Sequence, residues 1–370
     1  MHGLNFVNDY DGRRIEREQI STPFYAPEDE GEEDDTSSTN VVNTDIEMAL
    51  EDWEIINPQL PESWRSQDWQ NRPVRFVDGK DVGQTVAWLR GTDGSFVAMR
   101  LAEIGSVVMK NVEGELRREF AQVQRVLAMN TSVFPWEEIE SFALGLREHD
   151  IYLLPTSKTP ADSEVNFEEI RQLAQRRTAQ EMNVLEEHAI SRYNDLPMIV
   201  DGNLKSHEGG FDIINSPVFG VVKKPKKLHL NRRGLETMFS LKEGQRTPAF
   251  SFFSSTTKSG EQLTNYFPVI AWYLRLCSGD GIEPNVGLVR VEVSQKWFSN
   301  MGYGDTQINE AGKEFMNQLT RTVYEYRCRQ KSYRRMKISL EPIVRAEESL
   351  GSLFCQSQTL KNKFYRLTNL

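Results

Sequence analysis

The chain contains 370 residues, of which 38% are apolar and 26% charged, and its formal net charge is −10. This length fits one large domain or two modest ones. The composition supports a soluble globular core and excludes a membrane bundle, because the longest apolar stretch, residues 267–276, is about half the length that spans a bilayer. Three widely separated cysteines predict no disulfide framework and no thiolate zinc site, and with no secretory signal they favour the cytoplasm.

The acidity is concentrated near the N-terminus. Residues 1–54 hold 16 acidic and three basic residues, and seven of the eight residues 28–35 are carboxylates. Such a run repels itself and buries too little apolar surface to become ordered. We therefore expect an acidic, largely flexible arm over residues 1–54 and one domain over residues 55–370. The arm is either a solvated linker or a mimic of nucleic-acid charge that covers a basic groove.

The elements of the domain follow from its hydrophobic patterns and turns. Short β-rich runs with Asp-Gly turns predict a meander of antiparallel hairpins over residues 74–101. The further strands are expected at 198–200, 218–222, 249–253, 266–276 and 286–293. Helices are expected at 111–129, 136–148, 166–193, 310–328 and 342–354. Strands on either side of a long helix, with helices closing the chain, predict an α/β or α+β fold in which helices cover a mixed sheet.

Two of these strands end in the same way, with Asp78-Gly79 and with Asp201-Gly202. An acidic residue at the end of an apolar strand is held rigidly at the edge of a sheet, and the following glycine allows a ligand to approach. Two such carboxylates on neighbouring strands suit Mg²⁺ or Mn²⁺, which prefer oxygen ligands. The alternative is that both are ordinary Asp-Gly hairpin turns.

Two helices add candidate carboxylates. On the helix over residues 166–193, helical spacing places Glu181 in the middle of the apolar stripe, beside Arg177, and Glu186 on the opposite face. Glu181 is either a metal ligand or the partner of Arg177 in an i, i+4 salt bridge. On the late helix, Glu347 is the carboxylate nearest the packed face, and the alternative for it is a partly exposed helix boundary.

Basic residues gather in two places. Lys223 and Lys224 follow the strand at 218–222, with Arg246 further on, and a second group of lysines and arginines with interleaved tyrosines spans residues 321–337. These residue types neutralise phosphates and stack on unpaired bases. Near a carboxylate cleft they favour a polyanionic substrate, although a basic stretch can also be a solvated face. Arg290 would join them if the polar side of its strand lines the cleft.

The order of these motifs resembles the NurA nuclease family. The resemblance covers residues 70–300 and rests on the segments Val77-Asp78-Gly79, Arg177 to Glu181, Val200-Asp201-Gly202-Asn203-Leu204, 218–223, 241–247, 272–276 and 287–293. It implies an RNase H-like core, a nuclease that depends on manganese or magnesium and acts on DNA ends, and a homodimer. It also implies a HerA-type hexameric ATPase as partner, in end resection, repair or antiviral defence.

By position, the resemblance assigns the metal ligands of the family to Asp78, Glu181 and Asp201. The family's later histidine is missing, and Glu347 is the nearest substitute. We therefore expect a two-metal phosphodiesterase with catalytic residues Asp78, Glu181, Asp201 and Glu347, in which two cations about 4 Å apart activate a water and stabilise the leaving oxygen. The residues expected to contact DNA are Lys223, Lys224, Arg246, Arg177 and Arg290.

Two other functions are compatible with the same residues. The missing histidine also fits a catalytically silent adaptor that docks on an ATPase ring through its N-terminal arm. An RNase of the same fold would differ only in its substrate.

Overall fold

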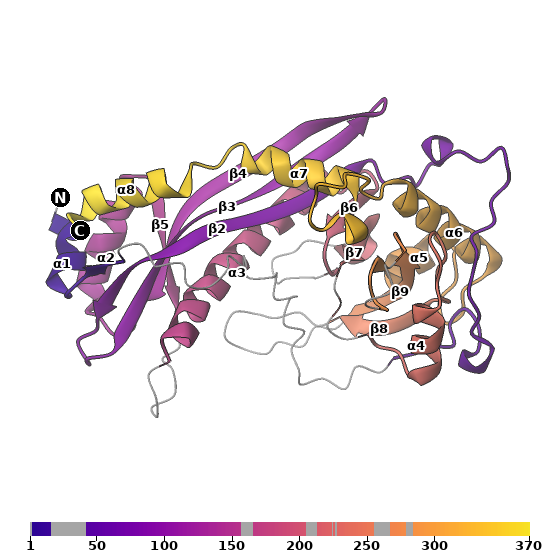
Figure 1. Cartoon of the computed structure of the whole chain (residues 1–370), viewed down its shortest axis with the longest axis horizontal. Helices are drawn as coiled ribbons and strands as arrows, with labels where there is room; N and C mark the ends of the chain where they lie inside the picture. The colour runs from indigo at the N-terminus through magenta and orange to yellow at the C-terminus, as the bar shows by residue number, and fades with distance from the viewer. Residues whose placement is uncertain are drawn as a thin grey trace.

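The computed structural model describes residues 2–15, 42–156, 166–204, 213–223, 225, 228–254, 267–278 and 284–370. The acidic run at 28–35 and Lys224 lie outside the described residues. Within the described part of the chain, ten strands form one mixed sheet. Figure 1 shows this sheet as an elongated layer with helices on both faces.

The sheet has the strand order β5-β4-β3-β2-β6-β7-β10-β9-β8, and β1 pairs with β2. The strand bounds are β1 Arg13–Arg14, β2 Arg75–Arg90, β3 Phe96–Val112, β4 Glu115–Asn130, β5 Ile151–Thr156, β6 Met198–Asp201, β7 Val218–Val222, β8 Phe250–Ser254, β9 Phe267–Arg275 and β10 Leu288–Ser294. β6 runs parallel to both β2 and β7, and β5 runs parallel to β4, whereas the remaining pairs are antiparallel. The centre of the sheet is thus parallel, and its two wings are antiparallel except for the parallel edge strand β5.

Helices cover both faces of this sheet. The α-helices are α1 Phe6–Asp9, α2 Trp136–Arg147, α3 Phe167–Tyr193, α4 Arg232–Phe239, α5 Gln295–Asn300, α6 Glu310–Glu325, α7 Glu341–Gly351 and α8 Ser357–Thr368. Short 3-10 turns occur at His2–Asn5, Leu50–Asp52, Ser66–Asp68, Ile213–Asn215 and Met336–Ile338. No helix in these described segments is long and apolar enough to cross a bilayer.

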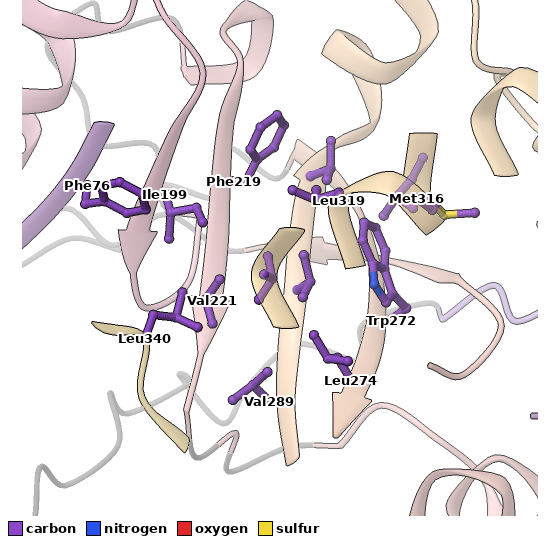
Figure 2. Close-up of a cluster of buried hydrophobic side chains, with 14 of the residues drawn as sticks. Phe76, Ile199, Phe219, Val221, Trp272, Leu274, Val289, Met316, Leu319 and Leu340 are labelled. Atoms are coloured by element: carbon purple, nitrogen blue, oxygen red, sulfur yellow. The ribbon is translucent and has the colours of Figure 1, made fainter. Parts of the chain in front are cut away.

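The alternation of side chains along β2 divides the core into two layers. Phe76 packs with Ile199 of β6, Phe219 of β7 and residues of α5, α6 and α7, and Figure 2 shows part of this cluster. Val77 faces the other way and packs with Ala189 and Ile190 of α3. We call these the α7 face and the α3 face. This division determines which polar side chains of the central strands can meet.

Two expected elements are different in the structure. β2 continues through Asp78-Gly79 without turning, because β3 pairs with it along its length. Residues 111–129 form most of β4 and no helix. The β3–β4 connection is a tight hairpin in which Glu113 and Gly114 both have positive φ, 54° and 91°, and Gly114 N donates to Asn111 Oδ1. Such a two-residue turn starts a new strand immediately.

Parts of the N-terminal arm belong to the packed body. Leu4, Phe6 and Val7 are buried among residues of α2, α8 and the long strands. Residues 43–56 bridge to the body at both ends, where Asn43 pairs with Ser251 and Ile56 pairs with Arg246. We call residues 43–56 the N-terminal strap. Trp53 in this strap is fully buried. The body therefore includes both described parts of the arm.

Candidate active site: a buried carboxylate cluster

The two Asp-Gly sequences lie side by side on parallel strands. Val77 of β2 is in register with Val200 of β6, so Asp78 and Asp201 are the next pair and project from the same face. Asp201 is in register with Val221 of β7, and Lys223 follows two residues later on that face. The α7 face of the sheet thus presents Asp78, Asp201 and Lys223 together.

Asp78 is the most deeply buried carboxylate of this group. The residue is 5% exposed, and its Oδ2 accepts no hydrogen bond from any residue that the structure describes. Burial raises the pKa of Asp78 well above its usual value, and the negative charges of Asp201, Glu347 and Glu186 raise it further, while Lys223 opposes them. An ionised oxygen without a partner in such a place is costly unless a cation approaches it.

Asp201 forms an ion pair with Lys223. The Nζ of Lys223 lies 2.5 Å from Asp201 Oδ2, and the two side chains are 10% and 16% exposed. Burial alone lowers the pKa of Lys223, but the charges of Asp201 and Asp78 outweigh it, and the net pKa is raised. Burial raises the pKa of Asp201, with Lys223 acting in the opposite direction. Lys223 is therefore a fixed positive charge between carboxylates.

Glu347 of α7 approaches the same place from above the sheet. Its side chain accepts hydrogen bonds from Tyr333 Oη at 2.6 Å and from Arg335 at 2.9 Å. Its charge contributes to the raised pKa of both Asp78 and Asp201. Burial and the bond to Glu347 together raise the pKa of Tyr333 to about 12, so this phenol stays protonated and donates.

On α3 the carboxylate that approaches Asp78 is Glu186 and not Glu181, and it approaches from the α3 face of the sheet. Glu181 pairs with Arg177 at 3.0 Å, the salt-bridge alternative, and both side chains are more than 20% exposed. Glu186 packs on the backbone of Gly79, where an added Cβ would lie 2.7 Å from the Glu186 carboxyl carbon. Glu186, unlike Glu181, is among the charges that raise the pKa of Asp78. The α3 carboxylate nearest Asp78 is therefore Glu186.

The group consists of oxygen donors around an ammonium and is not a preformed metal centre. No three His, Cys, Asp or Glu side chains of the described residues are grouped so that they could hold a metal ion as they stand. Lys223 neutralises part of the charge that would attract a cation. Chemically, such a group can bind a hard divalent cation if Lys223 moves aside, and Lys223 can contact a phosphate that arrives with the cation.

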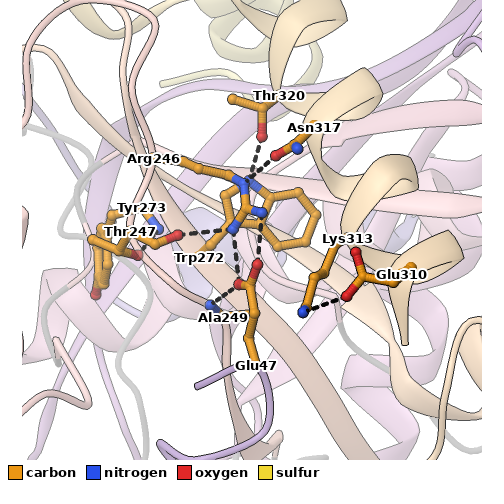
Figure 3. Close-up of polar contacts among 10 residues, drawn as sticks. All are labelled: Glu47, Arg246, Thr247, Ala249, Trp272, Tyr273, Glu310, Lys313, Asn317 and Thr320. Carbon is orange, nitrogen blue, oxygen red and sulfur yellow. Dashed lines mark hydrogen bonds and ion pairs between the residues drawn. The ribbon is translucent and has the colours of Figure 1, made fainter. Parts of the chain in front are cut away.

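Arg246, expected to contact DNA, has a structural role. Its residue is 1% exposed, and its guanidinium binds Glu47 of the N-terminal strap through two hydrogen bonds of 2.7 and 2.8 Å. Asn317 and the carbonyl of Thr247 accept its other protons. Figure 3 shows this arrangement beside Trp272. An arginine enclosed in this way cannot reach a substrate, so the prediction for Arg246 is wrong.

Arg290 is also placed differently from the expectation. It is 2% exposed, forms an ion pair with Glu292 at 2.8 Å and lies over the ring of Phe252. Glu292 is in register with Gly220, which is in register with Val200, so this pair projects from the α3 face. Arg290 is thus buried on the face opposite Asp78 and Asp201, which excludes the predicted contact with DNA. Two more of the residues expected to contact DNA are described. Lys223 lies in the cluster, and Arg177 lies on α3 in its salt bridge with Glu181.

Comparisons with known proteins give only distant similarity. No protein-family model matches the chain, and no curated protein matches it. Among solved structures, the NurA nuclease from Sulfolobus solfataricus aligns with a TM-score of 0.35 at 12% identity, over 86% of this chain and 87% of that one. The catalytic domain of human endonuclease V aligns with a TM-score of 0.28 at 12% identity, over 81% of this chain and 91% of that one.

Proposed function

We propose that the protein is a divalent-metal-dependent nuclease that hydrolyses phosphodiester bonds in DNA. The observation that carries this proposal is Asp78 Oδ2, a buried oxygen with no hydrogen-bond partner in the described structure, next to Asp201 and Glu347. A protein gains no stability from such an arrangement of like charges, whereas a cation site requires it. The proposed metal is Mn²⁺ or Mg²⁺, because the donors are all carboxylate oxygens.

The residues that would hold the cation are Asp78, Asp201 and Glu347, while Glu186 would add negative charge from the α3 face. When bound, the cation would polarise the scissile phosphate and lower the pKa of a bound water. Lys223 would release Asp201 and neutralise a non-bridging phosphate oxygen. Tyr333 and Arg335 would keep the Glu347 carboxylate oriented toward the cluster, as they do in the structure.

The wider biological role that we propose rests on the motif order of the sequence. It comprises an RNase H-like catalytic core related to the NurA family, action on DNA ends, a homodimer, and a HerA-type hexameric ATPase as partner in the cytoplasm. End resection in repair and antiviral defence are both compatible with such an enzyme. The alternative is that the substrate is RNA. A direct comparison of the cleavage of DNA and RNA oligonucleotides distinguishes the two.

The test is metal-dependent cleavage of linear labelled DNA by the wild type and by matched variants. Asp78→Asn and Asp201→Asn should each abolish cleavage in Mn²⁺, because the cation loses a charged ligand. Glu347→Gln should reduce it by at least about tenfold, whereas Glu348→Gln, one residue along α7, should leave it unchanged, because Glu348 pairs with Arg345 at the surface. Retained cleavage in both aspartate variants would refute the mechanism.

A second comparison separates the two carboxylates of α3. Glu186→Gln should weaken the Mn²⁺-induced rise in melting temperature, because Glu186 contributes to the charge around Asp78. Glu181→Gln should leave this rise unchanged, since Glu181 is occupied by Arg177. The opposite result would support Glu181 as the metal ligand on α3, as the sequence predicts.

Two observations favour the alternative of a catalytically silent adaptor. Lys223 already neutralises Asp201, and the described residues hold no preformed group of three metal ligands. In an adaptor this ion pair would be permanent, and calorimetric titration with Mn²⁺ would show no binding that depends on Asp78. Binding that is lost in Asp78→Asn would exclude the adaptor.

A further inference from the structure

The connection between α6 and α7 carries a dense group of positive charges. Residues 329–337 contain five basic side chains and no acidic one, namely Arg329, Lys331, Arg334, Arg335 and Lys337. We call this segment the basic loop. Arg329, Lys331 and Arg334 are exposed, whereas Arg335 and Lys337 are partly buried. Both flanking helices, labelled α6 and α7 in Figure 1, pack on the α7 face of the sheet. Asp78 and Asp201 project from this same face.

The basic loop is attached directly to the carboxylate cluster. Tyr333 and Arg335 both bind Glu347, at 2.6 and 2.9 Å. The charge of Arg335 also acts on Asp201, and the charge of Lys223 acts on Tyr333. The two hydrogen bonds to Glu347 hold the middle of the loop beside the cluster, so the exposed arginines and lysine next to them lie at its rim.

The basic loop carries its positive charge at high density. Five of its nine residues are basic, and one of them, Arg335, pairs with Glu347 at 2.9 Å. Positive side chains gathered in this way attract a polyanion. A polynucleotide supplies regularly spaced phosphates, and each phosphate neutralised by Lys or Arg releases counterions and adds to affinity.

We propose that the basic loop binds the sugar-phosphate backbone of a polynucleotide and holds one strand against the carboxylate cluster. The inference rests on the proposed function for the bond that is cut, but polynucleotide binding itself requires no metal and no cleavage. Arg329, Lys331 and Arg334 would contact phosphates along the strand. Arg335 acts as a positioning residue, because it holds Glu347 and not the substrate.

The test measures binding of a fluorescent single-stranded oligonucleotide to the full chain in EDTA, by anisotropy at several salt concentrations. The variant Arg329→Gln/Lys331→Gln/Arg334→Gln leaves Tyr333 and Arg335 in place. We expect its affinity to fall by at least about tenfold at low salt, and the slope of log affinity against log salt to fall by about 2. The control is Arg232→Gln/Lys363→Gln/Arg366→Gln, which removes three exposed basic residues elsewhere and should change affinity by less than about twofold.

The two proposals fail in different ways. Unchanged binding in the loop variant, or an equal loss in the control variant, would overturn the role of the basic loop, whether or not the protein cleaves DNA. A preference of the loop for an acidic protein over the oligonucleotide would overturn it as well. Loop-dependent binding by a protein that never cleaves DNA would support the loop and refute the nuclease. The Mn²⁺-induced rise in melting temperature should be the same in the loop variant and the wild type, because the carboxylates are intact.

Discussion

At the scale of single residues, the burial of Asp78 costs stability, and the proposed cation site would need this burial. Its carboxylate is buried without a hydrogen-bond partner for Oδ2 among the described residues, and its ionisation is opposed by three neighbouring negative charges. Lys223 neutralises the charge of Asp201 more than that of Asp78, because its ammonium contacts Asp201. The cluster as it stands is therefore incompletely neutralised, and a bound cation would stabilise it.

This imbalance gives a pH prediction for the metal-free protein. Burial raises the pKa of Asp78 well above its usual value, so between these two values the folded state holds a proton that the unfolded chain has lost. The Asp78 contribution to the free energy of unfolding must then fall as the pH rises through this interval. Asp78→Asn removes this titrating group. The free energy of unfolding of the variant should therefore exceed that of the wild type by little near pH 4 and by more toward pH 8. Urea unfolding in EDTA across this range measures the difference, and an advantage independent of pH would contradict the argument.

The structure brings Asp78, Asp201 and Glu347 together and leaves Glu181 outside this group, whereas their roles as metal ligands stay a prediction. The two aspartates follow apolar strand residues, and their alignment needs only parallel pairing of β2 with β6. On α3 the buried residues are Ala174, Thr178, Leu185, Ala189 and Ile190. Small and polar residues such as Thr178 and Ala189 carry little hydrophobic signal. The predicted stripe was therefore centred on Glu181, although the buried side lies further round the helix toward Glu186.

At the scale of elements, the N-terminal strap depends on one buried ion pair. Glu47 accepts two hydrogen bonds from Arg246 and one from the backbone amide of Ala249, and its side chain is 2% exposed. Removing one member of a buried pair leaves an uncompensated charge, which costs far more than the pair itself contributes. No pattern in the sequence links position 47 to position 246, so Arg246 was predicted to contact DNA.

We therefore predict that Glu47→Ala lowers the free energy of unfolding by about 3–5 kcal/mol, because the Arg246 guanidinium loses its counter-ion. Glu51→Ala on the same strap should change it by less than about 0.5 kcal/mol, since Glu51 is exposed. Chemical denaturation of both variants measures the difference. Equal stability of the two would show that the strap does not depend on this pair.

The sequence predicted the bounds of several helices and strands closely, but it failed at two places where the residue types gave the wrong signal for a turn. The helix expected at 166–193 is α3, Phe167–Tyr193, with the Asn166 side chain capping its first turn. The strand expected at 218–222 is β7, Val218–Val222. The failure at β4 arose because the turn residues Glu113 and Gly114 are not a common hairpin pair. β2 was divided in two for the opposite reason, since Asp78-Gly79 has the composition of a turn but lies within a paired strand.

At the scale of the whole molecule, the two ends of the described chain share one core. Leu4, Phe6 and Val7 pack with Leu360 and Phe364 of α8, and Asn8 Nδ2 donates to the carbonyl of Thr368 at 2.8 Å. The ring of Phe6 stacks on Phe142 of α2 with centroids 4.8 Å apart. The contacts with α8 join segments more than 300 residues apart, and Figure 1 shows both termini at the same end of the sheet.

Phe6→Ala should lower the free energy of unfolding by about 3–5 kcal/mol, because it leaves a cavity between α2 and α8. Trp136→Ala is the matched aromatic control at the same end of the molecule, and it should change stability by less than about 1 kcal/mol, since Trp136 is 70% exposed. Thermal and urea unfolding measure both. A loss in Phe6→Ala no larger than in Trp136→Ala would mean that this core forms without the first residues.

The parallel pairing of β2 with β6 has a consequence for how the protein would acquire the proposed activity. Asp78, Asp201 and Glu347 are supplied by stretches of chain more than 100 residues apart, and no single stretch contains two of them. Contacts so distant along the chain form late and slowly during folding. A partly folded molecule, or a proteolytic fragment, would hold the acidic side chains apart and could not cut a nucleic acid indiscriminately. Affinity for manganese would then serve as a direct readout of completed folding.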